Sequence, residues 1–117
     1  MKRLLYAGAV AYLLLLSQFG NGYADGVYDG EWNGSARPIG GRCKPAIVTL
    51  TVLGKVVTGE ARFELGPLDI RGTVSADGAL GATIGFRHLT GKFILDSFEG
   101  TFDSLDCAWK MALKRTK

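Results

Sequence analysis

The sequence has few of the residues on which enzymes and metal sites commonly depend. It contains one histidine, His88, and two cysteines, Cys43 and Cys107, whose spacing matches no zinc-binding pattern. No glycine-rich phosphate-binding loop opens a helix, and no helical periodicity of apolar residues follows residue 26. We therefore expect a protein without enzymatic activity, bound metal or cofactor.

The sequence also lacks an apolar run long enough to cross a membrane. The longest run, residues 4–16, is shorter than the roughly 20 residues that a spanning helix needs. It follows two basic residues, and small residues, Gly22 and Ala24, come shortly after it. This order is typical of a cleaved secretory signal peptide.

We expect residues 1–24 to be the signal peptide and residues 25–117 to be one small exported domain, periplasmic or secreted, with no membrane span. An uncleaved membrane anchor is the alternative interpretation, and the mass of the exported protein distinguishes the two. Export also predicts that Cys43 and Cys107 form a disulfide, because the destination is oxidising.

A large excess of one charge is absent too. The net charge of the whole chain is +3, and the signal peptide contributes part of it, so we expect no nucleic-acid partner. Four basic residues form a stripe near the C-terminus, which could contact anionic lipid or an acidic partner, although a solvated face is the commoner meaning. These residues are Lys110, Lys114, Arg115 and Lys117.

The remainder of the chain alternates apolar and polar residues with the period of a β-strand. Turn residues separate the alternating segments, and Asp77-Gly78 is a strong hairpin signal. Such a series of short connections predicts an all-β, eight-stranded, antiparallel up-and-down barrel, which also removes exposed sheet edges. The eight segments are 27–35, 45–53, 56–65, 68–75, 79–87, 89–95, 98–103 and 107–114.

One parity of these segments collects the apolar residues, every aromatic of the exported domain included, and is expected to face the barrel interior. By the same rule Leu65, Leu68 and Leu95 are expected to point inward. Five glycines share this parity, and we interpret them as sites where strands bend or where an aromatic ring packs opposite. They are Gly34, Gly59, Gly72, Gly91 and Gly100.

The tripeptide Gly30-Glu31-Trp32 at the start of the first strand resembles the Gly-x-Trp signature of the calycins, which include lipocalins, avidins and bacterial metalloprotease inhibitors. The resemblance implies that the tryptophan closes one end of the barrel under a basic residue of the last strand, here Lys114 or Arg115. The hairpin 75–81 is similar to one found in avidins. The Tyr-Asp-Gly-x-Trp start and the late Asp-Cys-Ala-Trp-Lys segment also resemble small secreted proteobacterial proteins.

The interior aromatics are the candidate ligand-binding residues. They could line an apolar pocket for a small ligand in the barrel mouth, which we expect at the Trp32 end. Eight short strands also give an interior that side chains can fill completely, and this is the favoured alternative. The candidate residues are Trp32, Phe63, Phe86, Phe93, Phe98, Phe102 and Trp109.

Other interpretations remain open on the sequence alone. The longer connection 36–44 could bind a protein partner, as in a protease inhibitor of the calycin type, and a structural role in the cell envelope is a third possibility. His88 is more simply a turn residue than a general base. Asp103 and Asp106 could seat a cation, but a polar turn explains them equally well.

Overall fold

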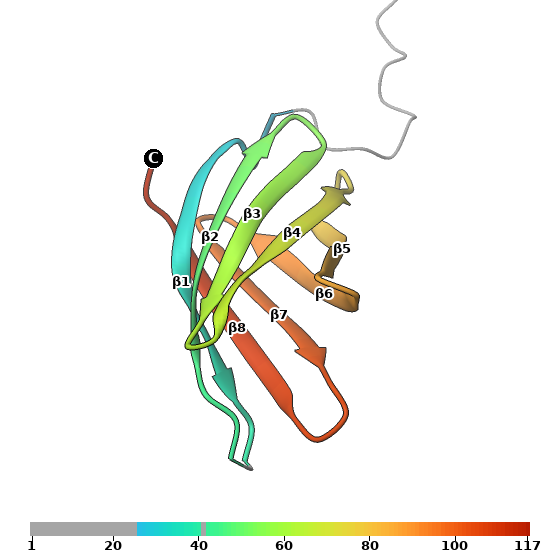
Figure 1. The fold of residues 1–117 in the computed structure, drawn as a ribbon. Coiled ribbons are helices and arrows are strands. Elements are labelled where there is room, and N and C mark those ends of the chain that lie inside the picture. Colours follow the sequence, from blue (N-terminus) through green and yellow to red (C-terminus); the bar gives the residue numbers. More distant parts are fainter. Residues whose placement is uncertain (1–25, 41) are drawn as a thin grey trace, which may run out of the picture.

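The computed structural model describes residues 26–40 and 42–117, and the predicted signal peptide lies outside this part of the chain. Within it, eight strands form a closed barrel (Figure 1). The strands are β1 (Gly30–Pro38), β2 (Ala46–Leu53), β3 (Val56–Phe63), β4 (Gly66–Val74), β5 (Ala79–Ile84), β6 (Arg87–Ile94), β7 (Ser97–Asp103) and β8 (Ala108–Arg115).

Each strand pairs antiparallel with its neighbour in sequence, and β8 returns to pair with β1. The prediction of an antiparallel up-and-down barrel is therefore confirmed. Trp32 marks the point of closure, because it lies opposite Leu50 of β2 and opposite Arg115 of β8. No helix among residues 26–40 and 42–117 is long and apolar enough to span a membrane.

The interior is apolar and follows the predicted alternation. In β2 the buried residues are Ala46, Val48, Leu50 and Val52, and the residues between them are exposed. Every side chain that is buried within the described residues is hydrophobic. Burial of this single face is the main force that closes the sheet on itself.

The barrel has two ends, which we name by what they carry. The terminal end holds Gly26, Lys117 and the connections β2–β3, β4–β5 and β6–β7. The disulfide end holds the other four connections and the bond between Cys43 and Cys107, which confirms the predicted pairing. In Figure 1 the terminal end is at the top and the disulfide end is at the bottom.

Inward-facing glycines make room for an aromatic ring, as the sequence suggested. The ring of Phe98 covers Gly91 and Gly100, and a Cβ atom added at Gly91 would overlap it. At Gly100 such an atom would lie 2.8 Å from the same ring. Glycine at these two positions therefore allows Phe98 to lie flat across the sheet and to remain 1% exposed.

The Asp77-Gly78 turn joins β4 to β5, as expected. The Asp77 carboxylate accepts hydrogen bonds from the Ser75 hydroxyl and from the backbone N–H of Ala79, and Gly78 adopts φ +93°. The bond from Ser75, that from Ala79 and the nearby charge of Lys92 hold the pKa of Asp77 below its usual value. The ionised carboxylate thus acts as the cap of this hairpin.

Three predicted strand ends are wrong in the same way. Leu65, Phe86 and Leu95 were expected to face inward, but they lie in turns and are 101%, 102% and 81% exposed. β5 ends at Ile84, which pairs directly with Arg87, so Gly85 and Phe86 form a two-residue turn. Odd-even alternation applies only where strands pair, and these leucines and the phenylalanine lie just beyond the last pair.

Candidate binding mouth at the disulfide end

The interior aromatics divide into two clusters, one near each end of the barrel. The terminal cluster packs Tyr28, Trp32 and Phe98 around the ring of Phe93. Trp32 meets Phe93 edge-on with ring centroids 4.7 Å apart, and Phe98 lies 4.6 Å from Phe93. Tyr28 covers Phe93 from outside, 5.5 Å away. These contacts give a filled interior at the terminal end.

Arg115 seals the terminal cluster. Its guanidinium lies 4.8 Å from the centroid of the Trp32 ring and pairs with Asp96 at 2.9 Å. It also donates to the backbone carbonyls of Val27 and Asp29, at 3.1 and 2.9 Å. The expected basic residue over the tryptophan is therefore Arg115. Lys114 instead points outward to Ser97.

The fully buried Trp32 therefore offers no ring face to a ligand at the terminal end. Its indole N–H donates to the carbonyl of Tyr28 at 3.0 Å, and its side chain is 0% exposed. Our expectation of a ligand beside Trp32 does not match this packing, because Arg115 already occupies the outer face of the ring. A hollow lined by aromatic side chains lies at the disulfide end instead.

The mouth at the disulfide end is a hollow of about 710 Å³. Phe102 and Trp109 stack in its wall with centroids 4.9 Å apart and planes 8° from parallel. Phe63 meets both rings edge-on, at 6.4 and 5.7 Å, and is itself only partly buried. The other lining residues are Cys43, Lys44, Glu64, Leu65, Gly66, Pro67, Leu68, Ile84, Arg87 and Ser104.

Strand pairing and the disulfide hold this wall in place. Phe102 of β7 lies directly opposite Trp109 of β8, which brings their rings together on the inner face. The Trp109 indole N–H donates to the carbonyl of Lys44 at 2.9 Å. The adjacent bond between Cys43 and Cys107 ties the same connection to the base of β8. The wall is thus preorganised, which lowers the entropic cost of binding.

The rim of the mouth carries charged groups that could orient a polar part of a ligand. Lys44 and Glu64 form an ion pair of 3.8 Å across the rim, with both side chains largely exposed. Arg87 lines the opposite part of the hollow and has no ion-pair partner among residues 26–40 and 42–117. The apolar wall and the charged rim together are typical of a site for a small organic ligand.

The seven candidate residues do not form one site. Trp32, Phe93 and Phe98 belong to the sealed terminal cluster. Phe63, Phe102 and Trp109 line the hollow at the disulfide end. Phe86 is a correction, because it lies in the β5–β6 turn and is fully exposed outside the barrel.

Several lining residues were missed by the sequence analysis. Ile84 and Leu68 were assigned to the interior without being recognised as pocket residues, and Leu68 is 41% exposed. Lys44 and Arg87 are on polar segments, and no sequence signal separates them from other surface cations. Leu65 was expected to point into the barrel, so the sequence analysis did not identify it as a residue of the rim.

Within residues 26–40 and 42–117, the candidates His88, Asp103 and Asp106 form no ion pair. His88 is an exposed residue of β6 opposite Thr83, not a turn residue. Asp103 ends β7 and Asp106 lies in the β7–β8 connection. In the part of the chain that the structure describes, no three His, Cys, Asp or Glu residues cluster as metal ligands would.

The connection 36–44 is shorter than the sequence suggested. β1 continues through Pro38, and Ala36 is fully buried inside the barrel. The backbone N–H of Ile39 donates to the carbonyl of Ala108 at 2.7 Å, so the connection begins tied to β8. The side chain of Ile39 nevertheless projects into solvent, with 60% of its surface exposed.

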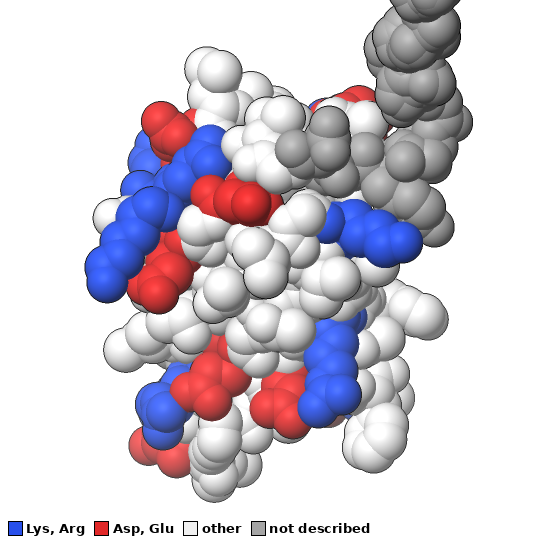
Figure 2. All heavy atoms as spheres, turned by 90° about the horizontal axis from the view of Figure 1, so that it is seen from above, with Lys and Arg blue, Asp and Glu red and all other residues white. Residues whose placement is uncertain are grey.

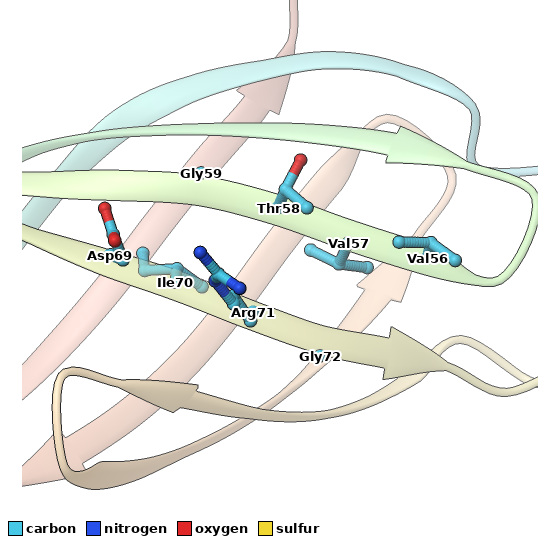
Figure 3. Close-up of a pocket in the computed structure, with 8 residues that line it drawn as sticks. All are labelled: Val56, Val57, Thr58, Gly59, Asp69, Ile70, Arg71 and Gly72. Carbon is cyan, nitrogen blue, oxygen red and sulfur yellow. The ribbon is translucent and has the colours of Figure 1, made fainter.

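A second hollow, of about 440 Å³, lies on the outer wall between β3 and β4 (Figure 3). Thr58 pairs with Arg71 across it, and both side chains are exposed. Val57 and Ile70, which also border it, are fully buried and belong to the core. This groove offers a mixed polar surface without an aromatic wall, so it is the weaker candidate for an apolar ligand.

Comparison of the chain with protein-family models, with curated proteins and with solved structures found no match. The fold that the structure establishes is an eight-stranded antiparallel closed barrel with one disulfide.

Proposed function

We propose that this protein is a non-enzymatic, exported binding module that holds a small apolar ligand in the mouth at the disulfide end. The observation that carries the proposal is the aromatic wall of Phe63, Phe102 and Trp109 around a hollow of about 710 Å³. Small-molecule sites commonly have volumes of roughly 300–1,000 Å³ and aromatic linings with a few polar groups.

The shape of the wall indicates what kind of ligand fits. The stacked rings of Phe102 and Trp109 are only 6% and 8% exposed, so the partly buried Phe63, nearly at a right angle to them, supplies the largest aromatic surface of the wall. A planar or chain-like apolar group could lie against this surface. A polar end would then meet Lys44 or Arg87 at the rim.

Export and a calycin relationship are further parts of the proposal. A secreted or periplasmic location is consistent with the disulfide, since such bonds persist in oxidising compartments. The relationship to calycins is supported by the sequential closed barrel and by Arg115, which lies over Trp32. Because Arg115 covers Trp32 and seals that end of the barrel, a ligand would bind at the opposite end, where the hollow is open.

The proposal predicts that the neutral apolar dye N-phenyl-1-naphthylamine binds the oxidised protein with a rise in dye fluorescence. Phe63→Ser should weaken this binding by about tenfold or more, because it removes one wall of the mouth. Phe63 is only partly buried, so the variant should remain folded.

Phe86→Ser is the matched control, because it removes the same side chain from a fully exposed position outside the mouth. Dye affinity of this control should equal that of the unmodified protein. Equal weakening by both substitutions, or no fluorescence rise at any dye concentration, would reject the proposed site.

A further inference from the structure

Two arginines occupy inward-facing positions of the strands, one at each end of the barrel. Arg87 begins β6 directly opposite Ile84, whose side chain is fully buried. Arg115 ends β8 directly opposite Trp32, which is also fully buried. Residues that lie directly opposite each other on paired strands point to the same face of the sheet. Every other residue at an inward-facing position of the eight described strands is uncharged, so these two charges are exceptions on an apolar face.

The chain itself supplies the partners of Arg115. Its guanidinium forms an ion pair with Asp96 at 2.9 Å. It also donates hydrogen bonds to the backbone carbonyls of Asp29 and Leu95, at 2.9 and 3.3 Å. Figure 2, which views the barrel from this end, shows acidic and basic side chains lying beside one another. The inward-facing arginine of the terminal end is therefore part of the seal and leaves little capacity for a ligand.

Arg87 has no such partners, although it lines the mouth. Its side chain forms no ion pair and no hydrogen bond with any of residues 26–40 and 42–117. A guanidinium carries five N–H donors in a planar fork that matches the two oxygens of a carboxylate. At the open end of the barrel, the inward-facing arginine thus keeps its donors available beside an apolar hollow.

The charged residues that line the mouth leave one positive charge uncompensated. They are Lys44, Glu64 and Arg87. Lys44 and Glu64 form an ion pair of 3.8 Å, so these two charges offset each other. The charge that remains for a ligand to meet is that of Arg87.

Three exposed carboxylates near this end stand outside the mouth. Asp69 directly precedes the buried Ile70 in β4 and therefore points to the outer face. Asp103 directly follows the buried Phe102 in β7 and also points outward. Asp106 is exposed in the β7–β8 connection, and none of these three carboxylates lines the hollow. Because they are solvated, water and salt weaken their attraction for a guanidinium that faces the mouth.

We infer that the ligand of the mouth is a small organic anion, with an apolar body that lies against Phe63 and an oxyanion, such as a carboxylate, that binds Arg87. This inference rests on the proposed function and adds to it the charge of the ligand and the residue that selects for that charge. Hydrogen bonds between a guanidinium and a carboxylate are stronger than those between neutral groups, and an apolar surrounding strengthens them further. Arg87 is thus the residue that determines specificity for an anion.

The experiment compares two dyes with the same ring skeleton. N-phenyl-1-naphthylamine is neutral, and 1-anilinonaphthalene-8-sulfonate adds one anionic sulfonate. The readout is the dissociation constant of the anionic dye divided by that of the neutral dye, measured by fluorescence on the oxidised protein. Arg87→Gln should raise this ratio by about tenfold or more, because it removes the cation that binds the anionic group. Arg87 is exposed, so the variant should keep its fold.

Arg37→Gln is the matched control, because it removes an arginine from the outer face of the same end. Arg37 directly follows the buried Ala36 in β1, does not line the mouth and forms no ion pair with a described residue. This variant should leave the ratio unchanged.

The two dyes separate failure of this inference from failure of the proposed function. If the neutral dye binds but Arg87→Gln leaves the ratio unchanged, or changes it no more than Arg37→Gln does, the inference is overturned while the apolar site stands. If neither dye binds, the proposed site is rejected and the inference falls with it.

Discussion

Replacing both Cys43 and Cys107 with serine is expected to lower the free energy of unfolding by about 4 kcal/mol, because their bond closes a loop with a sequence separation of 64. The bond restricts the unfolded chain far more than the folded barrel. A domain of this size typically has about 5–15 kcal/mol of stability, so the loss would be a large fraction of the total. Urea unfolding of the oxidised protein and of the variant measures the difference.

Reductant supplies the internal control for the disulfide. It should lower the urea midpoint of the unmodified protein to that of the double serine variant and leave the variant itself unchanged. A midpoint that is unaffected by reductant would contradict the assigned bond. The variant should also bind dye less well, because Cys43 lines the mouth and the bond anchors the connection that accepts the Trp109 indole hydrogen bond.

Trp32→Ala is expected to cost about 3–5 kcal/mol of stability, the range for removal of a fully buried large aromatic from a core. The side chain is 0% exposed and meets Phe93 edge-on, while Arg115 covers its outer face. The substitution would leave a cavity and would remove the ring that the guanidinium contacts. Thermal or urea unfolding, followed by circular dichroism, measures the loss.

Phe86→Ala is the matched substitution for Trp32→Ala, since it removes an aromatic that is 102% exposed. Its effect should stay within about 0.5 kcal/mol, as for most surface substitutions. If Trp32→Ala cost no more than Phe86→Ala, Trp32 could not be the centre of the sealed end.

Much of the fold follows from alternation along the chain. In β2 the residues Ala46, Val48, Leu50 and Val52 are buried as the period-two pattern predicts. The pattern works because successive side chains along a strand point to opposite faces of the sheet. In a closed barrel only the inner face is shielded from water. The cysteine pair was predicted from the expectation that the chain is exported to an oxidising compartment, an argument that needs no structure.

The errors come from turns, where alternation no longer governs direction. Phe86 continues the β5 pattern in sequence, yet pairing stops at Ile84 and Gly85 reverses the chain. Leu65 and Leu95 follow the last residue pairs of β3 and β6 in the same manner. A two-residue hairpin with an apolar tip therefore looks like one more inward position until the register is known.

The candidate site was only half predictable because aromatic parity does not reveal which end of the barrel a ring reaches. Trp32 and Trp109 share the inner face, but their strands pair in a register that places them at opposite ends. Sealing of the terminal end depends on Arg115, whose contacts with Val27 and Asp29 join distant segments. Sequence alone gives the inventory of rings, and register assigns each ring to an end.

We propose a barrel with one sealed end and one ligand-binding end, and each of the two tryptophans reports on one of these ends. The Trp32 indole N–H donates to the carbonyl of Tyr28 at the terminal end, and the Trp109 indole N–H donates to that of Lys44 at the mouth. Titration of N-phenyl-1-naphthylamine, followed by the two indole N–H signals in an ¹H–¹⁵N spectrum, should shift the Trp109 signal and leave the Trp32 signal in place. A shift of the Trp32 signal alone, or no change in either signal at saturating dye, would contradict this account.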